Sequence, residues 1–503
     1  MTETAIAHDP HVDAKSGDIQ PIIPGFHPDP TICRVGDDYY LVTSSFEYFP
    51  GAPIFHSTDL VSWKQIGNIL TRRDQFRAGT PGPSTGVYGS TLRHHDGRFW
   101  FVTTNVSDFD SGQVIVSATD PAGPWSNPVW VSEAIGIDPD LCWDDDGQPY
   151  LTWHVLDFTV GGQEIRQAPI DLATGRLLEQ SYRVWQGSGL PSAEGPHLFK
   201  IDAYWYIVLA EGGTERGHVV TVARGASPRG PFEPCPWNPV FTHRSTMHPV
   251  QSVGHADLVQ APDGRWAAVY LGARPRGSTP GFHVLGRETF IAGVDWVDAW
   301  PVFDSNRFLV PVPDTGFSDD FRGTELNARW VVPSAELASI ASLDPAGGLR
   351  FSSDDWPRAL VCTRVEDFEW TADAVVERAG RLSLRLDDRH WCGIEFRDRT
   401  ARVVVQIGDI FQESAPFPVA ADSITLRLAA ADPKIAPLPF GYAGPDEISL
   451  SVGVDGQFTQ LARLDGRYFS TEVAAGFTGR VLGVGAPNSL GRITTVSYRP
   501  ARD

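Results

Sequence analysis

Hydrophobic and polar residues alternate across positions 20–305 in a unit that recurs five times. Each copy has a short turn followed by an aromatic, strand-like run, and the leading residues are Asp37, Asp96, Asp146, Asp202 and Asp263. Asp-Gly between apolar runs is typical of a β-hairpin, because glycine adopts positive φ freely. Steps of 59, 50, 56 and 61 residues leave room for four short strands per copy. The repeat predicts a five-bladed β-propeller, with stacked sandwiches as the alternative.

The same repeat places five polar residues in equivalent positions. Counting back eight residues from each leading aspartate reaches Asp29, Tyr88, Asp138, Glu194 and His255. If each turn joins the first and second strands of a blade, equal offsets mean equal depth on the innermost strand, and the side chains converge on one mouth of the channel. Like charges and burial both disfavour ionised carboxylates, so a purely structural ring of this kind would be unfavourable. The offsets therefore indicate a functional site.

The repeat stops after residue 305, and a join containing Pro311 and Pro313 covers residues 306–316. From Phe317 onward, alternating stretches at 381–386, 402–407 and 423–428 read as half-buried antiparallel strands. They predict a β-sandwich over 317–503, of concanavalin-like or jelly-roll type. Residues 1–19 are a polar N-terminal extension. The predicted fold class is all-β, a five-bladed propeller followed by a sandwich.

Composition and charge narrow the classes of partner. The 503 residues carry a net charge of −21, which repels nucleic acid and anionic membranes, so we expect a neutral ligand. Five scattered cysteines without a Cys-x-x-Cys pair are read as reduced thiols, and no metal site is predicted. No signal-peptide core and no apolar run of about 18 residues occurs, so a cytoplasmic protein is expected.

Six segments together resemble glycoside hydrolase family 43, in particular its β-xylosidase and α-L-arabinofuranosidase members with a C-terminal β-sandwich. They are residues 24–30, 43–51, 137–141, 194–197, 254–258 and 285–289. No single motif is specific for the family. Six motifs in the family's order and spacing, across nearly the whole chain, are specific. The resemblance implies a five-bladed propeller of inverting glycosidases, which agrees with the count from the repeat.

The resemblance also implies roles for individual residues. Asp29 matches the general base, Glu194 the general acid, and Asp138 the carboxylate that orients the acid and tunes its pKa. The substrate-binding residues implied or considered are Arg287, His255, Phe46 and Tyr88. Inversion needs one carboxylic acid and one carboxylate, separated by about 6.5–9.5 Å. Glu194 must then stay protonated near neutral pH while Asp29 stays ionised.

Two positions depart from the family pattern. Tyr88-Gly89-Ser90 stands where many relatives have Trp-Ala-Pro, which alters one wall of the pocket. Val481 falls where similar xylosidases place a phenylalanine on a sandwich loop that closes the pocket. The chemistry needs no cofactor, although the resemblance leaves open a calcium ion in the channel near His255, as in some relatives.

The expected activity is that of an inverting exo-glycosidase that removes terminal β-1,4-linked xylose from xylo-oligosaccharides. An α-L-arabinofuranosidase, or an enzyme with both activities, is the alternative. A carbohydrate-binding propeller without catalysis, or a protein-interaction scaffold, is favoured less, because binding alone needs no paired acid and base. The expected partner is a small oligosaccharide, not nucleic acid or a membrane. The sequence does not fix the oligomeric state, and a homo-oligomer is among the states considered.

Overall fold

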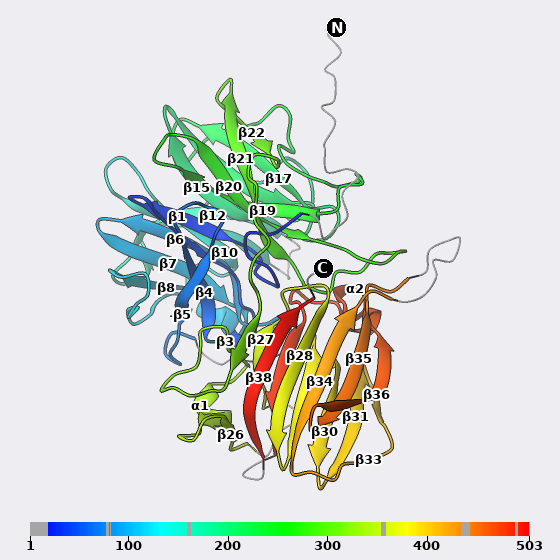
Figure 1. Ribbon diagram of the computed structural model, residues 1–503. Helices are drawn as coiled ribbons and strands as arrows, with labels where there is room; N and C mark the ends of the chain where they lie inside the picture. Colours follow the sequence, from blue (N-terminus) through cyan, green and yellow to red (C-terminus); the bar gives the residue numbers. More distant parts are fainter. Residues whose placement is uncertain are drawn as a thin grey trace.

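The computed structural model describes residues 19–76, 80, 82–157, 162–353, 359–433, 443–487 and 491–501. Nearly all of its regular structure is β, arranged as a propeller beside a two-sheet sandwich (Figure 1). The predicted N-terminal extension lies outside the described residues apart from Ile19. The described helices are the 3₁₀ turns η1 (Val106–Ser111) and η2 (Gly466–Phe469) and the short α1 (Leu337–Ile340) and α2 (Thr471–Ala474). None of these could span a bilayer.

The propeller has five antiparallel blades, as predicted, each in chain order from the channel outward. Blade 1 contains β1 (Thr31–Val35), β2 (Asp38–Val42), β4 (Gly51–Ser57) and β5 (Lys64–Leu70). Blade 2 contains β6 (Val87–His95), β7 (Arg98–Asn105), β8 (Gln113–Ala118) and β9 (Val129–Val131). Blade 3 contains β10 (Ile137–Trp143), β11 (Pro149–Asp157) and β12 (Gly162–Asp171), with β13 (Arg176–Leu177) and β14 (Tyr182–Trp185) both pairing with β12.

The last two blades follow the same order. Blade 4 contains β15 (Glu194–Ile201), β16 (Tyr204–Glu211), β17 (Val219–Gly225) and β18 (Glu233–Pro234). Blade 5 contains β19 (Gln251–Gln260), β20 (Trp266–Ala273), β21 (Glu288–Val297) and β22 (Trp300–Asp304). The first strands of neighbouring blades contact one another in a closed ring. Asp257 on β19 closes this ring by accepting hydrogen bonds from the Thr31 hydroxyl at 2.8 Å and the Ile32 N–H at 2.9 Å.

Two antiparallel sheets form the second domain. One has the order β25 (Ala341–Leu343), β26 (Leu349–Phe351), β38 (Arg492–Pro500), β28 (Trp370–Glu377), β34 (Ser423–Ala431), β35 (Glu447–Val454) and β36 (Gln457–Asp465), with β23 (Phe317–Asp319) on β38. The other has the order β27 (Val361–Arg364), β37 (Val481–Gly485), β29 (Gly380–Arg385), β30 (His390–Arg397), β31 (Thr400–Ile407) and β32 (Ile410–Glu413), with β33 (Phe417–Pro418) on β31. Strict alternation of buried and half-buried residues along β28 shows why this sequence forms a strand with one face in the core.

The two domains share a small core and a small sheet. The strand β24 (Val332–Pro333) pairs with β3 (Tyr48–Phe49), which lies between β2 and β4 of blade 1. One buried cluster joins propeller residues such as Phe26 and Phe46 to sandwich residues such as Leu360 and Val481. The α2 turn lies at the end of the sandwich nearest the propeller (Figure 1). The sandwich is therefore fixed beside the propeller by packing and by backbone pairing.

Candidate active site

The five residues with equal offsets meet in one cavity. Tyr88, Asp138, Glu194 and His255 lie on the innermost strands β6, β10, β15 and β19, and Asp29 precedes β1 by two residues. All five line a cavity of about 230 Å³. The structure therefore brings together the residues that the repeat placed at equal depth.

The inner strands are irregular at this level. Asp29, Asp138 and His255 have φ angles of 55°, 54° and 51°, and Gly195, directly after Glu194, has φ 59°. Positive φ is uncommon for residues other than glycine. The β10–β11 and β15–β16 pairings also shift register here. Bulges of this kind redirect side chains and are frequent beside active sites, which explains how these groups point into the cavity.

Asp29 is held ionised by its neighbours. Its Oδ2 accepts a hydrogen bond from the Ser44 hydroxyl at 2.7 Å, and its Oδ1 lies 3.2 Å from Arg287 Nη1 and 3.4 Å from His255 Nδ1. Burial alone would raise the pKa of Asp29, but Arg287, His255 and Ser44 outweigh it and hold the pKa well below its usual value. Asp29 is therefore ionised at neutral pH.

Glu194 lies in the opposite electrostatic environment. Burial and the nearby Asp138 carboxylate raise the pKa of Glu194 to about 8. Burial also raises the pKa of Asp138, although His255 opposes this rise and the Gly195 N–H donates to Asp138 Oδ2 at 3.2 Å. These two contacts favour the ionised form of Asp138, so the proton of the pair stays on Glu194 at neutral pH. One cavity thus holds a permanent carboxylate and a carboxylic acid.

His255 is the positive partner of these carboxyl groups. Burial disfavours its charged form, but Asp29, Asp138 and Glu194 outweigh burial and raise the pKa of His255 to about 9. The ring fits because its neighbours are glycines. A Cβ on Gly89 would lie 3.0 Å from His255 Cε1 and 2.4 Å from Asp138 Oδ1. In this structure a Cβ fits at Gly89 only if Asp138 or His255 moves.

His154 is a neighbour that the sequence analysis missed. It lies on β11, and one of its ring nitrogens, one Asp138 oxygen and one Glu194 oxygen all lie within 4.8 Å of one another. The side chain is buried, and neither ring nitrogen has a hydrogen-bond partner among the residues that the structure describes. Burial lowers the pKa of His154 to about 4, so the ring is neutral at pH 7.

An aromatic wall faces the carboxyl groups. The ring centroids of Phe46 and Tyr88 lie 5.3 Å apart, and the Phe477 centroid lies 5.9 Å from each of them. The Arg287 guanidinium carbon lies 5.6 Å from the Phe46 ring and 5.4 Å from the Phe477 ring, and Nη1 donates to Thr214 Oγ1 at 2.8 Å. The predicted residues Phe46, Tyr88 and Arg287 all line the cavity, whereas Thr214 and Phe477 were not predicted.

The expectation about Val481 is wrong. Val481 is fully buried in β37, where it pairs with Arg364 and Arg385, and it does not reach the cavity. The pocket phenylalanine from the sandwich is Phe477, four residues earlier. Its N–H donates to Ser84 Oγ at 2.8 Å, which attaches the sandwich loop to the propeller. Val481 is therefore not a pocket residue, and Phe477 is the sandwich residue that lines the cavity.

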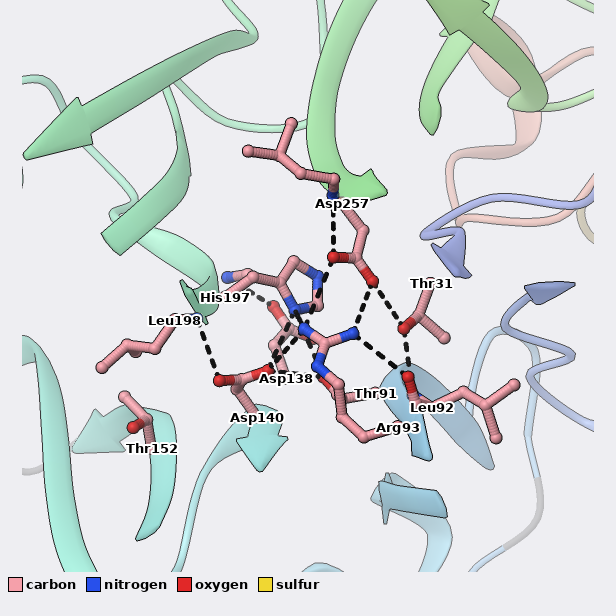
Figure 2. A network of polar contacts seen from close by, with 12 residues as sticks. Thr31, Thr91, Leu92, Arg93, Asp138, Asp140, Thr152, His197, Leu198 and Asp257 are labelled. Carbon is pink, nitrogen blue, oxygen red and sulfur yellow. Dashed lines mark hydrogen bonds and ion pairs between the residues drawn. The ribbon is translucent and has the colours of Figure 1, made fainter. Parts of the chain in front are cut away.

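A second polar network fills the channel next to this site. Figure 2 shows Arg93, on β6, between Asp140 and Asp257. Its Nη2 lies 2.9 Å from Asp140 Oδ1, and its Nη1 lies 2.9 Å from Asp257 Oδ2. His197 Nδ1 lies 3.3 Å from the same Asp140 oxygen. Together with Thr31, this network joins all five blades, so Arg93 supplies the positive charge at the channel axis.

The residues near His255 do not fit a calcium site. Calcium is held by six to eight oxygen ligands. His255 is protonated and paired with Asp29, and the nearby Asp140 and Asp257 are already neutralised by Arg93. We therefore assign no step of the chemistry to a calcium ion.

Comparison with known proteins identifies the family. The family model described as glycosyl hydrolases family 43 matches residues 19–301. The chain belongs to this family. A second model, the β-xylosidase C-terminal concanavalin A-like domain, matches residues 318–496, which confirms the concanavalin-like type of the sandwich. The enzyme is thus a glycoside hydrolase with a C-terminal concanavalin-like domain.

Similar family 43 proteins carry two kinds of activity in their names. A non-reducing end α-L-arabinofuranosidase of Bacteroides ovatus is 37% identical over 92% of this chain and 90% of its own length. A xylosidase/arabinosidase of Butyrivibrio fibrisolvens is 47% identical over 66% of this chain and 68% of its own. The solved structure of a xylan β-1,4-xylosidase of Bacillus halodurans superposes with a TM-score of 0.85 at 28% identity, over 95% of this chain and 99% of its own.

Proposed function

We propose that the protein is an inverting exo-glycosidase that removes a terminal β-1,4-linked xylose from xylo-oligosaccharides. In this reaction Asp29 removes a proton from a water molecule that attacks the anomeric carbon. Glu194 donates its proton to the leaving oxygen on the opposite face of the sugar. Asp138 keeps the pKa of Glu194 high and orients it. The water oxygen bonds to the anomeric carbon as the glycosidic bond breaks, and the new hydroxyl group on that carbon has the inverted configuration.

One feature carries this proposal: the two carboxyl groups lie in opposite electrostatic surroundings within one cavity. Arg287 and His255 keep Asp29 ionised, while burial and Asp138 keep Glu194 protonated, with its pKa raised to about 8. General acid and general base catalysis by two carboxyl groups requires this difference. A site that only binds sugar gains nothing from it, so the arrangement argues against a propeller without catalysis.

The small size of the cavity supports exo action. At about 230 Å³ the cavity is smaller than the roughly 300–1,000 Å³ of pockets for drug-sized ligands. Phe46, Tyr88 and Phe477 form its aromatic wall, and the last of these comes from the second domain. A space of this size suits one terminal sugar. We further propose a neutral oligosaccharide as the partner, no cofactor requirement, and a cytoplasmic location.

An α-L-arabinofuranosidase is the second candidate, because relatives of both names match the chain. Assays of nitrophenyl β-D-xyloside and nitrophenyl α-L-arabinofuranoside at equal concentration compare the two. The proposal expects the larger kcat/KM for the xyloside. A larger kcat/KM for the arabinoside would make α-L-arabinofuranosidase the favoured activity. Proton NMR of the first product should show the inverted anomer. Initial release of the retained anomer would refute the mechanism.

A further inference from the structure

The buried ring of His154 has no function in the reaction above. It lies on the second strand of blade 3, with 1% of its surface exposed. Both ring nitrogens lack hydrogen-bond partners among the described residues. A buried polar group without a partner is unfavourable and rare in native structures, so it requires an explanation.

The position of the ring suggests one. Three donor atoms from three neighbouring strands, an Asp138 oxygen on β10, a His154 nitrogen on β11 and a Glu194 oxygen on β15, all lie within 4.8 Å of one another. A neutral imidazole with no other partner offers its lone pair without breaking an existing bond. Asp138 and Glu194 also line the cavity, which gives a small ion a path to the site.

We propose that Asp138, His154 and Glu194 form a binding site for a divalent ion of the zinc class, and that an ion bound there inhibits the enzyme. The inhibition, but not the binding, rests on the proposed function. Zinc takes imidazole and carboxylate ligands at about 2.0–2.2 Å, so tetrahedral ligand atoms lie roughly 3.4 Å apart. The three donors must therefore move closer together, and Glu194, which is only half-buried, can provide this movement.

Binding would inhibit for a simple reason. A metal ion on Glu194 replaces the acid proton, which is released to solvent, so no proton remains for the leaving oxygen. The mixed nitrogen and oxygen donors favour zinc over magnesium and calcium, which prefer oxygen ligands. His255 and Arg287 carry positive charge nearby and weaken the binding of any cation. We therefore expect reversible inhibition and not a permanent structural ion.

The test uses the full chain after treatment with a chelator. Zinc chloride is titrated into wild type, His154→Leu and His154→Gln, and binding is measured by calorimetry. Inhibition is then measured on nitrophenyl xyloside relative to the metal-free rate of each variant, with magnesium and calcium chloride as ionic controls. His248 is a buried histidine that does not line the cavity, so His248→Gln is the matched control.

We expect zinc to bind and inhibit wild type and His248→Gln alike. Removing one ligand should weaken both effects at least about tenfold in the two His154 variants. Equal zinc affinity in wild type and both His154 variants would overturn the proposal, and so would equal inhibition by magnesium. Zinc binding that depends on His154, in a protein that hydrolyses no glycoside, would support the metal site and refute the proposed function instead.

Discussion

The backbone N–H of Phe477, in the sandwich, donates a hydrogen bond to Oγ of Ser84, in the propeller, at 2.8 Å. The Ser84 carbonyl accepts a hydrogen bond from the Tyr88 hydroxyl at 2.7 Å, and the Ser84 N–H donates one to the buried Glu47 carboxylate at 3.1 Å. Arg287 Nη2 in turn donates to the Phe477 carbonyl at 3.3 Å. The second domain therefore completes the wall of the pocket, and hydrogen bonds at both the N–H and the carbonyl of Phe477 hold it there.

We expect Phe477→Ala to lower kcat/KM by about tenfold, which corresponds to about 1.4 kcal/mol, the scale of one good aromatic contact. The loss should appear mainly in KM, because the ring lines the cavity proposed to hold the sugar and takes no part in the proposed proton transfers. Phe411→Ala is the matched control, since Phe411 is an exposed phenylalanine of the same domain. Equal kinetics for wild type and Phe477→Ala would contradict a closing function for the sandwich loop.

The repeat made much of the propeller site predictable. A tight hairpin turn fixes the register of the strands it joins, so equal offsets from five turns placed five residues at one depth. His154 could have been found in the same way. Counting outward from the turn at residues 144–148, a regular hairpin places His154 opposite Asp138. The observed bulge shifts the pairing by one residue, to Ile137, but keeps the ring beside the carboxylate.

The remaining site residues could not be predicted from local pattern. Phe477 lies in a loop without periodicity, and only the packing of the sandwich on the propeller brings it to Tyr88. The same lack of a repeat led to Val481 as the expected loop residue. Arg93 is five residues from Tyr88 on one strand, yet its charge points to the channel axis, where Asp140 and Asp257 neutralise it. Such contacts depend on the assembled blades.

The roles proposed for Asp29 and Glu194 predict different responses to the leaving group. Asp29→Ala should lose activity on every substrate, by about 10²–10⁴-fold or more, because no base activates water. Glu194→Ala should lose activity by a similar factor on xylobiose but little on dinitrophenyl xyloside, whose leaving group needs no proton. The measurement is kcat/KM for both variants on both substrates. If each variant lost the same factor on each substrate, the roles would be wrongly assigned.

The pH dependence should report the proton on Glu194. Its pKa is raised to about 8, so kcat/KM should fall as pH rises through about 8. The pKa of Asp29 lies well below its usual value, so no acid limb should appear at mildly acid pH.

Asp138→Asn tests the cause of that basic limb. Burial still raises the pKa of Glu194 in this variant, but the repulsion from a second carboxylate is gone, so the pKa falls. The basic limb should move to lower pH by about one unit or more. A limb that stays in place would mean that Asp138 does not set the pKa of the acid.

We expect any side chain at position 89 to lower the activity. A Cβ there would lie 2.4 Å from Asp138 Oδ1, closer than any ordinary contact, so Gly89→Ala must displace the carboxylate that is proposed to orient Glu194. A displacement of about 1 Å can cost about 10²-fold, and we expect a loss of that order in kcat on xylobiose. Gly67→Ala is the matched control, because the nearest atom to its added Cβ is 4.0 Å away. Unchanged kcat in Gly89→Ala, with an unchanged thermal midpoint, would mean that the position of Asp138 matters less than its charge.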